Sequence, residues 1–592
     1  MIIGNSKSEL GTRIFLKTLP AQILYYAVNF ICTSVTGFVI SVTQSSASMS
    51  VFALCSPMFS IIMILGTVIS SGSMILCGYN IGSGDVKGIK ITKSTAIGMC
   101  IAFGVLFTLV TVFFSVPIAY AFGTKKFLIT QASCYIKGIA VGIIPIIMNM
   151  QLYSFLQIKG KSKTIIKCTI IQSAISVSFI LFVAFVLKSG MTGIALANSA
   201  SAFVAMILLV IYLKKTDLQS FHITQDYSPR NIKTIVALGI PVAATPLMIS
   251  IRGIFLNNMI MQYGGTQAAA AMTILASIWV FMDAVVYGTG NTVGIISSIS
   301  YGESDKESVV HSFYTAVKYG GLLAIIVAII YILSSSRVAN SLSDDPIIIS
   351  NAVVLICFYS LGGAVNILLM TLIGIYQGTE QKKLALWCNF FLQIVTPVIS
   401  CLVFAPIWGI TAIWASYLIA PILTVIIIPV AVKIINGIFP KNIEDIAVNE
   451  GMHFVYRLSE SLFSKEDIAG FSERVAGWCL EHGITRQRSN QCGLFLEEVL
   501  VNIFDNAFVN YENTIFTEKQ QIDVLLCIKQ DDSINIRLRD TAPFYDVVSR
   551  ANLYSKSKSL MLENPDIAII SGLSKELTFE RIFDMNYLHV SL

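Results

Sequence analysis

Two ionisable side chains stand inside long apolar stretches, where a charge needs either a partner or water. Arg252 lies in an apolar stretch near residues 233–262, and Asp283 lies in the next one, near 267–298. A charge at the middle of a membrane costs several kcal/mol unless it is paired or hydrated. We therefore expect Arg252 and Asp283 to pair. Two interpretations stay open: a structural link between helices, or a transport site at which Asp283 exchanges Arg252 for a substrate or a proton.

Polar side chains in other apolar stretches are weaker candidates for such a site. Asn29 and Ser34 lie in the first stretch and suit the polar wall of a cavity. Asn366 lies in the tenth stretch. Amides and hydroxyls at such positions more often join helices by hydrogen bonds than bind ligands.

A second group of polar residues lies near the C-terminus. In the predicted helix 486–510, Glu498, Asn502 and Asn506 are spaced four apart and share one face. Asp540 ends the predicted strand "INIRLRD" further along the chain. Such a face is either a ligand-binding wall or a solvated surface, and the residues by themselves favour the solvated surface.

The apolar stretches belong to an internal duplication. Three landmarks recur at nearly one offset, which is typical of a repeated unit: Gly82–Asp85 with Gly302–Asp305, Pro20 with Pro241, and Gly193 with Gly409. The repeated polar turn joins the second and third stretches of each half. We expect Asp85 and Asp305 to be surface turn residues, with gating between the halves as the alternative.

Composition indicates a membrane protein. Hydrophobic residues make up 55% of the chain, charged residues only 12%, and the mean hydropathy is +0.75. A soluble domain has about 25% charged residues. The 12 cysteines are scattered singly, which favours buried apolar thiols over disulfides or a metal site. The net charge of +6 is explained by loop topology and indicates no binding of nucleic acid.

Twelve stretches are long enough to span a bilayer as helices. They lie near 14–40, 49–76, 94–118, 131–157, 164–187, 192–213, 233–262, 267–298, 313–335, 349–376, 384–404 and 409–437. This predicts an all-α polytopic protein with two six-helix lobes, residues 1–220 and 221–438. Lysine and arginine gather in alternate loops. By the positive-inside rule, both termini are then cytoplasmic and the protein lies in the cell membrane as a multi-pass protein.

The chain becomes more polar after residue 438. Residues 439–450 form a polar linker, and residues 451–592 are expected to fold as a cytoplasmic α/β sandwich domain. "MHFVYRL" is predicted to be a strand, and Ser464 with Asp467 begins a helix that ends near Gly483. "QIDVLLCIK" with "INIRLRD", and "ELTFERIF" with "NYLHVSL", alternate as two hairpins.

The ordered features of residues 10–437 resemble the multidrug and toxic compound extrusion (MATE) family. These are two six-span repeats, a proline early in the first and seventh spans, and the repeated turn. The resemblance implies an alternating-access antiporter that exports small organic, often cationic, compounds in exchange for H⁺ or Na⁺. Family members commonly carry an acid in the first span, where this chain has Ser34 and Val35.

Residues 451–592 resemble the GHKL (Bergerat-fold) ATPases, particularly the branch of anti-sigma-factor serine kinases. The resemblance implies Mg-ATP as a cofactor, with Glu498 polarising water, Asn502 holding Mg²⁺, Asn506 near the phosphates and Asp540 on the adenine. The family's glycine two positions after that aspartate is Ala542 here, and its glycine-rich phosphate turn reads Asn564-Pro-Asp-Ile-Ala568. We therefore expect weak nucleotide binding with little hydrolysis, and no enzyme activity that powers transport.

Together these features predict a MATE-type exporter whose cytoplasmic domain senses a nucleotide or binds a cytoplasmic protein partner. Two alternatives stay open. One is a flippase for lipid-linked or amphipathic substrates with the same architecture. The other is a membrane-anchored signalling protein whose C-terminal domain binds or phosphorylates a partner.

Overall fold

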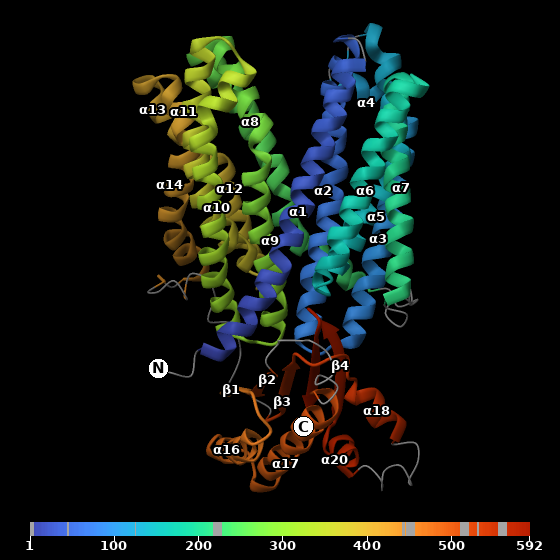
Figure 1. Ribbon diagram of the computed structural model, residues 1–592, viewed down its shortest axis with the longest axis vertical. Coiled ribbons are helices and arrows are strands. Elements are labelled where there is room, and N and C mark those ends of the chain that lie inside the picture. Colours follow the sequence, from blue (N-terminus) through green and yellow to red (C-terminus); the bar gives the residue numbers. More distant parts are fainter. Residues whose placement is uncertain are drawn as a thin grey trace.

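The computed structural model describes residues 5–43, 46–122, 124, 126–216, 228–437, 439–440, 445, 456–508, 520–529, 532–554 and 565–592. A tall bundle of helices stands on a smaller domain built around a β-sheet (Figure 1). The bundle has two groups of helices, one from each half of the chain, which we call the first and second lobes. The smaller domain, residues 456–592, is called the tail domain, and the bundle end that it faces is the tail-side end.

The first lobe is built by long helices that alternate in direction. Its elements are α1 (Asn5–Thr43), α2 (Ser46–Gly82), α3 (Val86–Phe113), α4 (Ser115–Ala121), η1 (Lys126–Leu128), α5 (Ile129–Ile158), α6 (Ser162–Leu181), η2 (Phe182–Leu187) and α7 (Gly190–Thr216).

The second lobe repeats this plan. Its elements are α8 (Pro229–Ile278), α9 (Val280–Gly302), α10 (Lys306–Leu342), α11 (Pro346–Gly378), α12 (Lys382–Phe390), η3 (Phe391–Val395), α13 (Thr396–Trp408) and α14 (Ile410–Asn436). The turn expected between the seventh and eighth spans is a break inside α8, where Gly265 has φ 60°. The eighth predicted span is divided again at Trp279, between α8 and α9.

Ten helices in the described part of the chain are long and apolar enough to cross a membrane. α1 and α9 are not among them, so the total of twelve spans stays a prediction. Many large apolar side chains of these helices face outward, including Phe113, Leu333 and Ile434, which are 76%, 77% and 75% exposed. Such an apolar exterior is typical of a protein surrounded by lipid.

The repeated turn has one geometry in both lobes. The Asp85 carboxylate accepts a hydrogen bond from the Gly88 N–H at 2.8 Å, and Asp305 accepts one from the Ser308 N–H at 3.0 Å. Each aspartate therefore caps the helix that follows it. The residue before each aspartate, Gly84 or Ser304, has a positive φ of 74° or 65°. The prediction of turn residues is confirmed for both acids. The prediction of a surface position holds for Asp85 and is wrong for Asp305, which is fully buried.

The first glycine of each repeated turn brings the two lobes into contact. A Cβ atom on Gly82 would lie 2.0 Å from the Ile299 carbonyl oxygen, and one on Gly302 would lie 2.1 Å from that of Tyr79. Close backbone approach of this kind requires a residue without a side chain. The ends of α2 and α9 therefore pack tightly across the lobe interface, at the tail-side end of the bundle.

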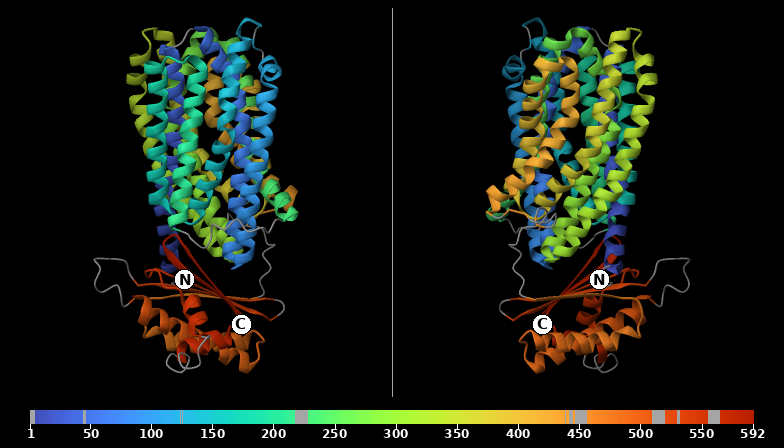
Figure 2. Two further views of the ribbon diagram at one scale, coloured as in Figure 1. Left: turned by 90° about the vertical axis from the view of Figure 1, so that its right-hand side faces the viewer. Right: turned by 90° about the vertical axis from the view of Figure 1, so that its left-hand side faces the viewer.

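The tail domain contains a five-stranded antiparallel sheet with helices on one face. The strand order is β1-β2-β3-β5-β4, from β1 (Tyr456–Leu462), β2 (Ile522–Ile528), β3 (Ile534–Asp540), β4 (Glu576–Ile582) and β5 (Met585–Ser591). The helical elements are α16 (Asp467–Glu481), α17 (Arg486–Ile503), η4 (Phe504–Phe508), α18 (Val547–Tyr554) and α20 (Pro565–Leu573). Figure 2 shows the sheet as a layer between these helices and the bundle.

Most local predictions for this domain are confirmed. Both hairpins form as antiparallel pairs, β2 with β3 and β4 with β5. The Ser464 hydroxyl donates to the Asp467 carboxylate at 2.9 Å, just before α16. β1 begins at Tyr456, and the first residues of the strand predicted there lie outside the described residues. The single α-helix predicted over 486–510 is wrong, because α17 ends at Ile503 and a π-helical turn, η4, follows.

Candidate functional site

A cavity of about 480 Å³ lies between the two lobes. The first lobe contributes Tyr26 from α1 and Ser60 and Thr67 from α2. The second lobe contributes most of the wall, from α8, α9, α11 and the α12–α14 region. Aromatic rings, aliphatic groups and a few polar groups share this wall. Such a lining can hold an organic molecule and orient it.

Arg252, Asp283 and Asn366 all line this cavity, as a transport site would require. The expected direct pair between Arg252 and Asp283 is wrong. The Arg252 guanidinium donates to the Gln393 side-chain oxygen at 2.7 Å, while Asp283 accepts a hydrogen bond from the Tyr359 hydroxyl at 2.7 Å. Each charge has a neutral partner because other helices of the lobe supply amide and hydroxyl groups to the same cavity wall. Both charges therefore keep the capacity to bind a ligand of opposite sign.

Sequence reasoning missed Gln393 and Tyr359. Gln393 lies in η3, a π-helical turn, where the extra residue per turn changes which side chains face inward. The available signal was an amide inside the apolar stretch "FFLQIV". Tyr359 gave no such signal, because tyrosine is common in apolar helices. The Asn366 side-chain oxygen is buried and has no hydrogen-bond partner among the described residues, so it suits contact with a ligand.

The remaining predicted residues of this group lie on α1. Asn29 and Ser34 belong to this helix, and their side chains fall outside the part that the structure describes. A different polar contact joins the lobes near the cavity: the Asn291 amide of α9 donates to the Gln22 side-chain oxygen of α1 at 2.8 Å. Asn291 also lines the cavity.

The second group of predicted residues lies in the tail domain and is partly brought together. Asn502 is 3% exposed, its Oδ1 accepts from the Tyr545 hydroxyl at 2.6 Å, and its Nδ2 donates to Asp566. Glu498 lies nearby, and partial burial together with the Asp566 charge raises the pKa of its carboxyl group. Asn506 is exposed on η4 and donates to the Asn502 backbone oxygen at 3.0 Å. The three residues therefore do not form one uniform wall.

Asp540 lies apart from that group, at the end of β3. It is 4% exposed and accepts hydrogen bonds from the Asn586 side chain at 2.8 Å and the Ala542 N–H at 3.0 Å. Burial raises the pKa of its carboxyl group to about 7. The hydrogen bond from Asn586 joins β3 to β5.

These described residues do not fit a magnesium-bound nucleotide as they lie. Both polar atoms of the Asn502 amide are engaged, and the Asp566 carboxylate lies against it. A triphosphate at this place would meet the negative charges of Glu498 and Asp566, and like charges repel. The assignment of Glu498, Asn502, Asn506 and Asp540 to a nucleotide therefore stays a prediction from resemblance.

Because the Asn502 amide and the Asp566 carboxylate would have to separate before a nucleotide could enter, we expect the intact chain to bind Mg-ATP only weakly, with a dissociation constant of about 1 mM, and to hydrolyse it little. Titration calorimetry on the detergent-solubilised protein measures this affinity. Asn502→Ala and Asp540→Asn should remove the heat of binding, while Asn535→Ala, on the opposite face of the sheet, should not. Micromolar affinity in the wild-type protein would contradict the prediction.

The two lobes, the internal repeat and the cavity between the lobes define a repeat-built membrane transporter. The MatE family model matches residues 19–179 and 241–403, one block in each lobe and more than half of the chain. The chain belongs to the MatE family.

Curated relatives carry efflux names. The chain is 24% identical over 318 residues to "Probable multidrug resistance protein YoeA" of Bacillus subtilis, covering 51% of this chain and 68% of that protein. It is 23% identical over 380 residues to "Multidrug export protein MepA" of Staphylococcus saprophyticus, covering 63% of this chain and 83% of that protein. These matches support multidrug efflux as the general class of transport.

A solved structure shares the fold of the bundle. It is titled "Outward-facing conformation of a multidrug resistance MATE family transporter of the MOP superfamily". Its TM-score is 0.67 with 19% identity, over 70% of this chain and 94% of that chain. The family model ends before the tail domain, so the GHKL resemblance of that domain stays a prediction.

Proposed function

We propose that the protein exports small organic, often cationic, compounds across the cell membrane by alternating access, coupled to H⁺ or Na⁺. The observation that carries this proposal is the cavity that holds both Arg252 and Asp283 between two lobes of a MatE-family fold. Ionisable groups inside a membrane protein are usually functional because their burial is costly. Asp283 is the proposed coupling group and cation ligand, and Arg252 is the proposed partner for negative or polar parts of the substrate.

The proposed orientation places the tail domain in the cytoplasm. The tail domain contacts the bundle close to lysines of two predicted cytoplasmic loops, Lys87 and Lys161. The Thr578 hydroxyl donates to the Gly84 backbone oxygen at 3.4 Å, and Lys161 pairs with Asp584 at 3.2 Å. Positive residues in the loops on one side of a membrane mark that side as cytoplasmic. The tail domain is thus proposed to regulate the exporter from inside the cell.

Transport by the purified protein in liposomes tests the proposal. We expect an imposed pH or sodium gradient to drive accumulation of a fluorescent organic cation, and expect no accumulation in protein-free liposomes. The single outcome that would overturn the proposal is folded protein that moves no organic cation under either gradient. Movement of lipid analogues in that case would favour a flippase.

A further inference from the structure

The sheet of the tail domain has two unlike faces. Strand side chains alternate between faces, and Ile534, Ile536 and Leu538 of β3 join the core formed with the tail helices. Arg537 and Arg539 point to the other face, which lies against the bundle. On the same face, Tyr587 of β5 belongs to the core of the bundle. One side of the sheet therefore holds its own domain together, and the other side contacts the membrane lobes.

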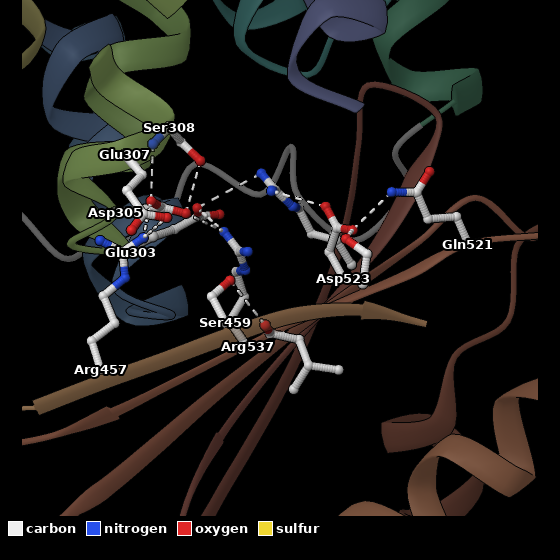
Figure 3. A network of polar contacts seen from close by, with 12 residues as sticks. Glu303, Asp305, Glu307, Ser308, Arg457, Ser459, Gln521, Asp523 and Arg537 are labelled. Atoms are coloured by element: carbon white, nitrogen blue, oxygen red, sulfur yellow. Dashed lines mark hydrogen bonds and ion pairs between the residues drawn. The ribbon is translucent and has the colours of Figure 1, made fainter. Parts of the chain in front are cut away.

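The second lobe meets this face through its repeated turn. Arg537 pairs with Glu303, Arg457 pairs with Asp305, and Arg539 lies 3.8 Å from Glu303. The two carboxylate side chains are fully buried, and Arg537 and Arg539 are almost so. Figure 3 shows Arg457 and Arg537 of the sheet converging on the carboxylates of the turn before α10. Removal of one partner from such a cluster leaves an uncompensated buried charge, which is strongly destabilising.

The first lobe meets the same sheet through the tip of the β4–β5 hairpin. The Phe583 N–H donates to the Lys159 backbone oxygen at 3.1 Å. The Phe583 side chain is 5% exposed and belongs to the core of the bundle. The next residue, Asp584, pairs with Lys161 at 3.2 Å. The tail domain is thus attached to both lobes at once, at the end where α2 and α9 cross.

The two copies of the repeated turn have diverged where the tail domain binds. Ser83 in the first copy corresponds to Glu303 in the second, and Asp85 is exposed where Asp305 is buried. Capping needs only the aspartate, since both copies cap their helices without a second acid. The Glu303 side chain therefore takes no part in capping, and its described partners are arginines of the tail domain.

We propose that the tail domain is an intramolecular latch that holds the tail-side ends of the two lobes together until its arginines leave Glu303 and Asp305. This inference rests on the proposed alternating-access function, because a sheet bound to both lobes resists their separation at that end. The cluster is also suited to release. One oxygen of Glu303 and two nitrogens of Arg537 are buried without a hydrogen-bond partner among the described residues. A partly satisfied polar network is costly to bury.

The distance between the lobes, measured in the intact chain, tests the latch. Spin labels on Lys90→Cys and Lys383→Cys, both exposed and one on each lobe, report the separation by pulsed electron paramagnetic resonance. The background carries serine at the exposed or partly exposed cysteines Cys32, Cys134, Cys168 and Cys357. Glu303→Ser, which restores the residue of the first copy, should raise the fraction of widely separated lobes roughly tenfold or more.

Three further variants keep the test decisive. The exchange Glu303→Arg with Arg537→Glu should return the lobes towards the wild-type separation. Arg474→Gln removes an exposed pair with Glu460 inside the tail domain and should change nothing. If Glu303→Ser yields too little folded protein, Phe583→Ala, at the buried first-lobe contact, should shift the distances in the same direction. An unchanged distance distribution in folded Glu303→Ser or Phe583→Ala protein would overturn the latch.

The readout also separates this inference from the proposed function. The distance measurement needs no substrate, so a latch that opens in a protein without transport would sustain the latch and overturn the exporter. Transport of organic cations by the wild-type protein, together with lobe distances that do not change in Glu303→Ser, would sustain the exporter and overturn the latch.

Discussion

Asp283→Asn should abolish gradient-driven accumulation while leaving the protein folded. The asparagine can still accept the hydrogen bond from Tyr359, but it cannot bind and release a proton or attract Na⁺. One exchanged proton per substrate and a gradient of one pH unit give about tenfold accumulation. We expect this factor to fall to about one in the variant. Uptake of a fluorescent cation into liposomes, with and without the gradient, measures the change.

Tyr359→Phe is the matched control for this experiment. It removes the 2.7 Å hydrogen bond to Asp283 and keeps the carboxylate, so accumulation should persist with an altered pH dependence. Size-exclusion profiles and unfolding temperatures of both variants show whether the fold is retained. Wild-type accumulation by folded Asp283→Asn, under both H⁺ and Na⁺ gradients, would reduce Asp283 to a structural residue.

Acid pH should weaken the latch through His589. This side chain lies on the lobe-facing side of β5 against Gly84, and its Nε2 is buried without a partner among the described residues. Burial, together with the charges of Arg537 and Arg539, lowers the pKa of His589 to about 3. An exposed histidine has a pKa of about 6.5. The undocked state therefore binds the proton better, and docking is lost as pH falls below about 6.5.

The expected change is about tenfold in the docking equilibrium between pH 7.5 and pH 5.5. Burial lowers the pKa of Lys159 to about 7. Protonation of Lys159 therefore also weakens docking as the pH falls, mainly above neutral pH. Lobe distances measured at both pH values give the equilibrium. His589→Gln should remove most of the change and leave the Lys159 part. Equal pH responses in the wild type and His589→Gln would exclude His589 as the group responsible.

Local pattern was enough to predict much of this fold. The length of the apolar stretches identifies the long helices, and two-residue alternation identifies both tail hairpins, because neighbouring residues decide these elements. The repeated Gly82–Asp85 turn also follows from local chemistry, since an aspartate before a helix caps it. The π-helical turn at η4 has no comparable sequence signal, so the α-helix predicted over 486–510 extends past the end of α17 at Ile503.

The candidate site was predicted less well, because its contacts join distant residues. The charges of Arg252 and Asp283 inside apolar stretches predict either a structural pair or a transport site, and the cavity that both residues line is seen only in the structure. Their partners, Gln393 and Tyr359, are 141 and 76 positions away, and only tertiary packing reveals them. The burial of Asp305 has the same origin, since it depends on Arg457, 152 positions further along.

The covalent connection between bundle and tail gives the latch a further property. α14 ends at Asn436 and β1 begins at Tyr456, so a short stretch of chain tethers the sheet to the lobes it binds. A short tether holds a binding partner at an effective concentration in the millimolar range. Weak contacts can therefore keep the latch closed in its own molecule, while the same domain supplied separately at micromolar concentration would scarcely bind. The fraction of molecules with a closed latch therefore does not depend on how many copies of the protein the membrane holds.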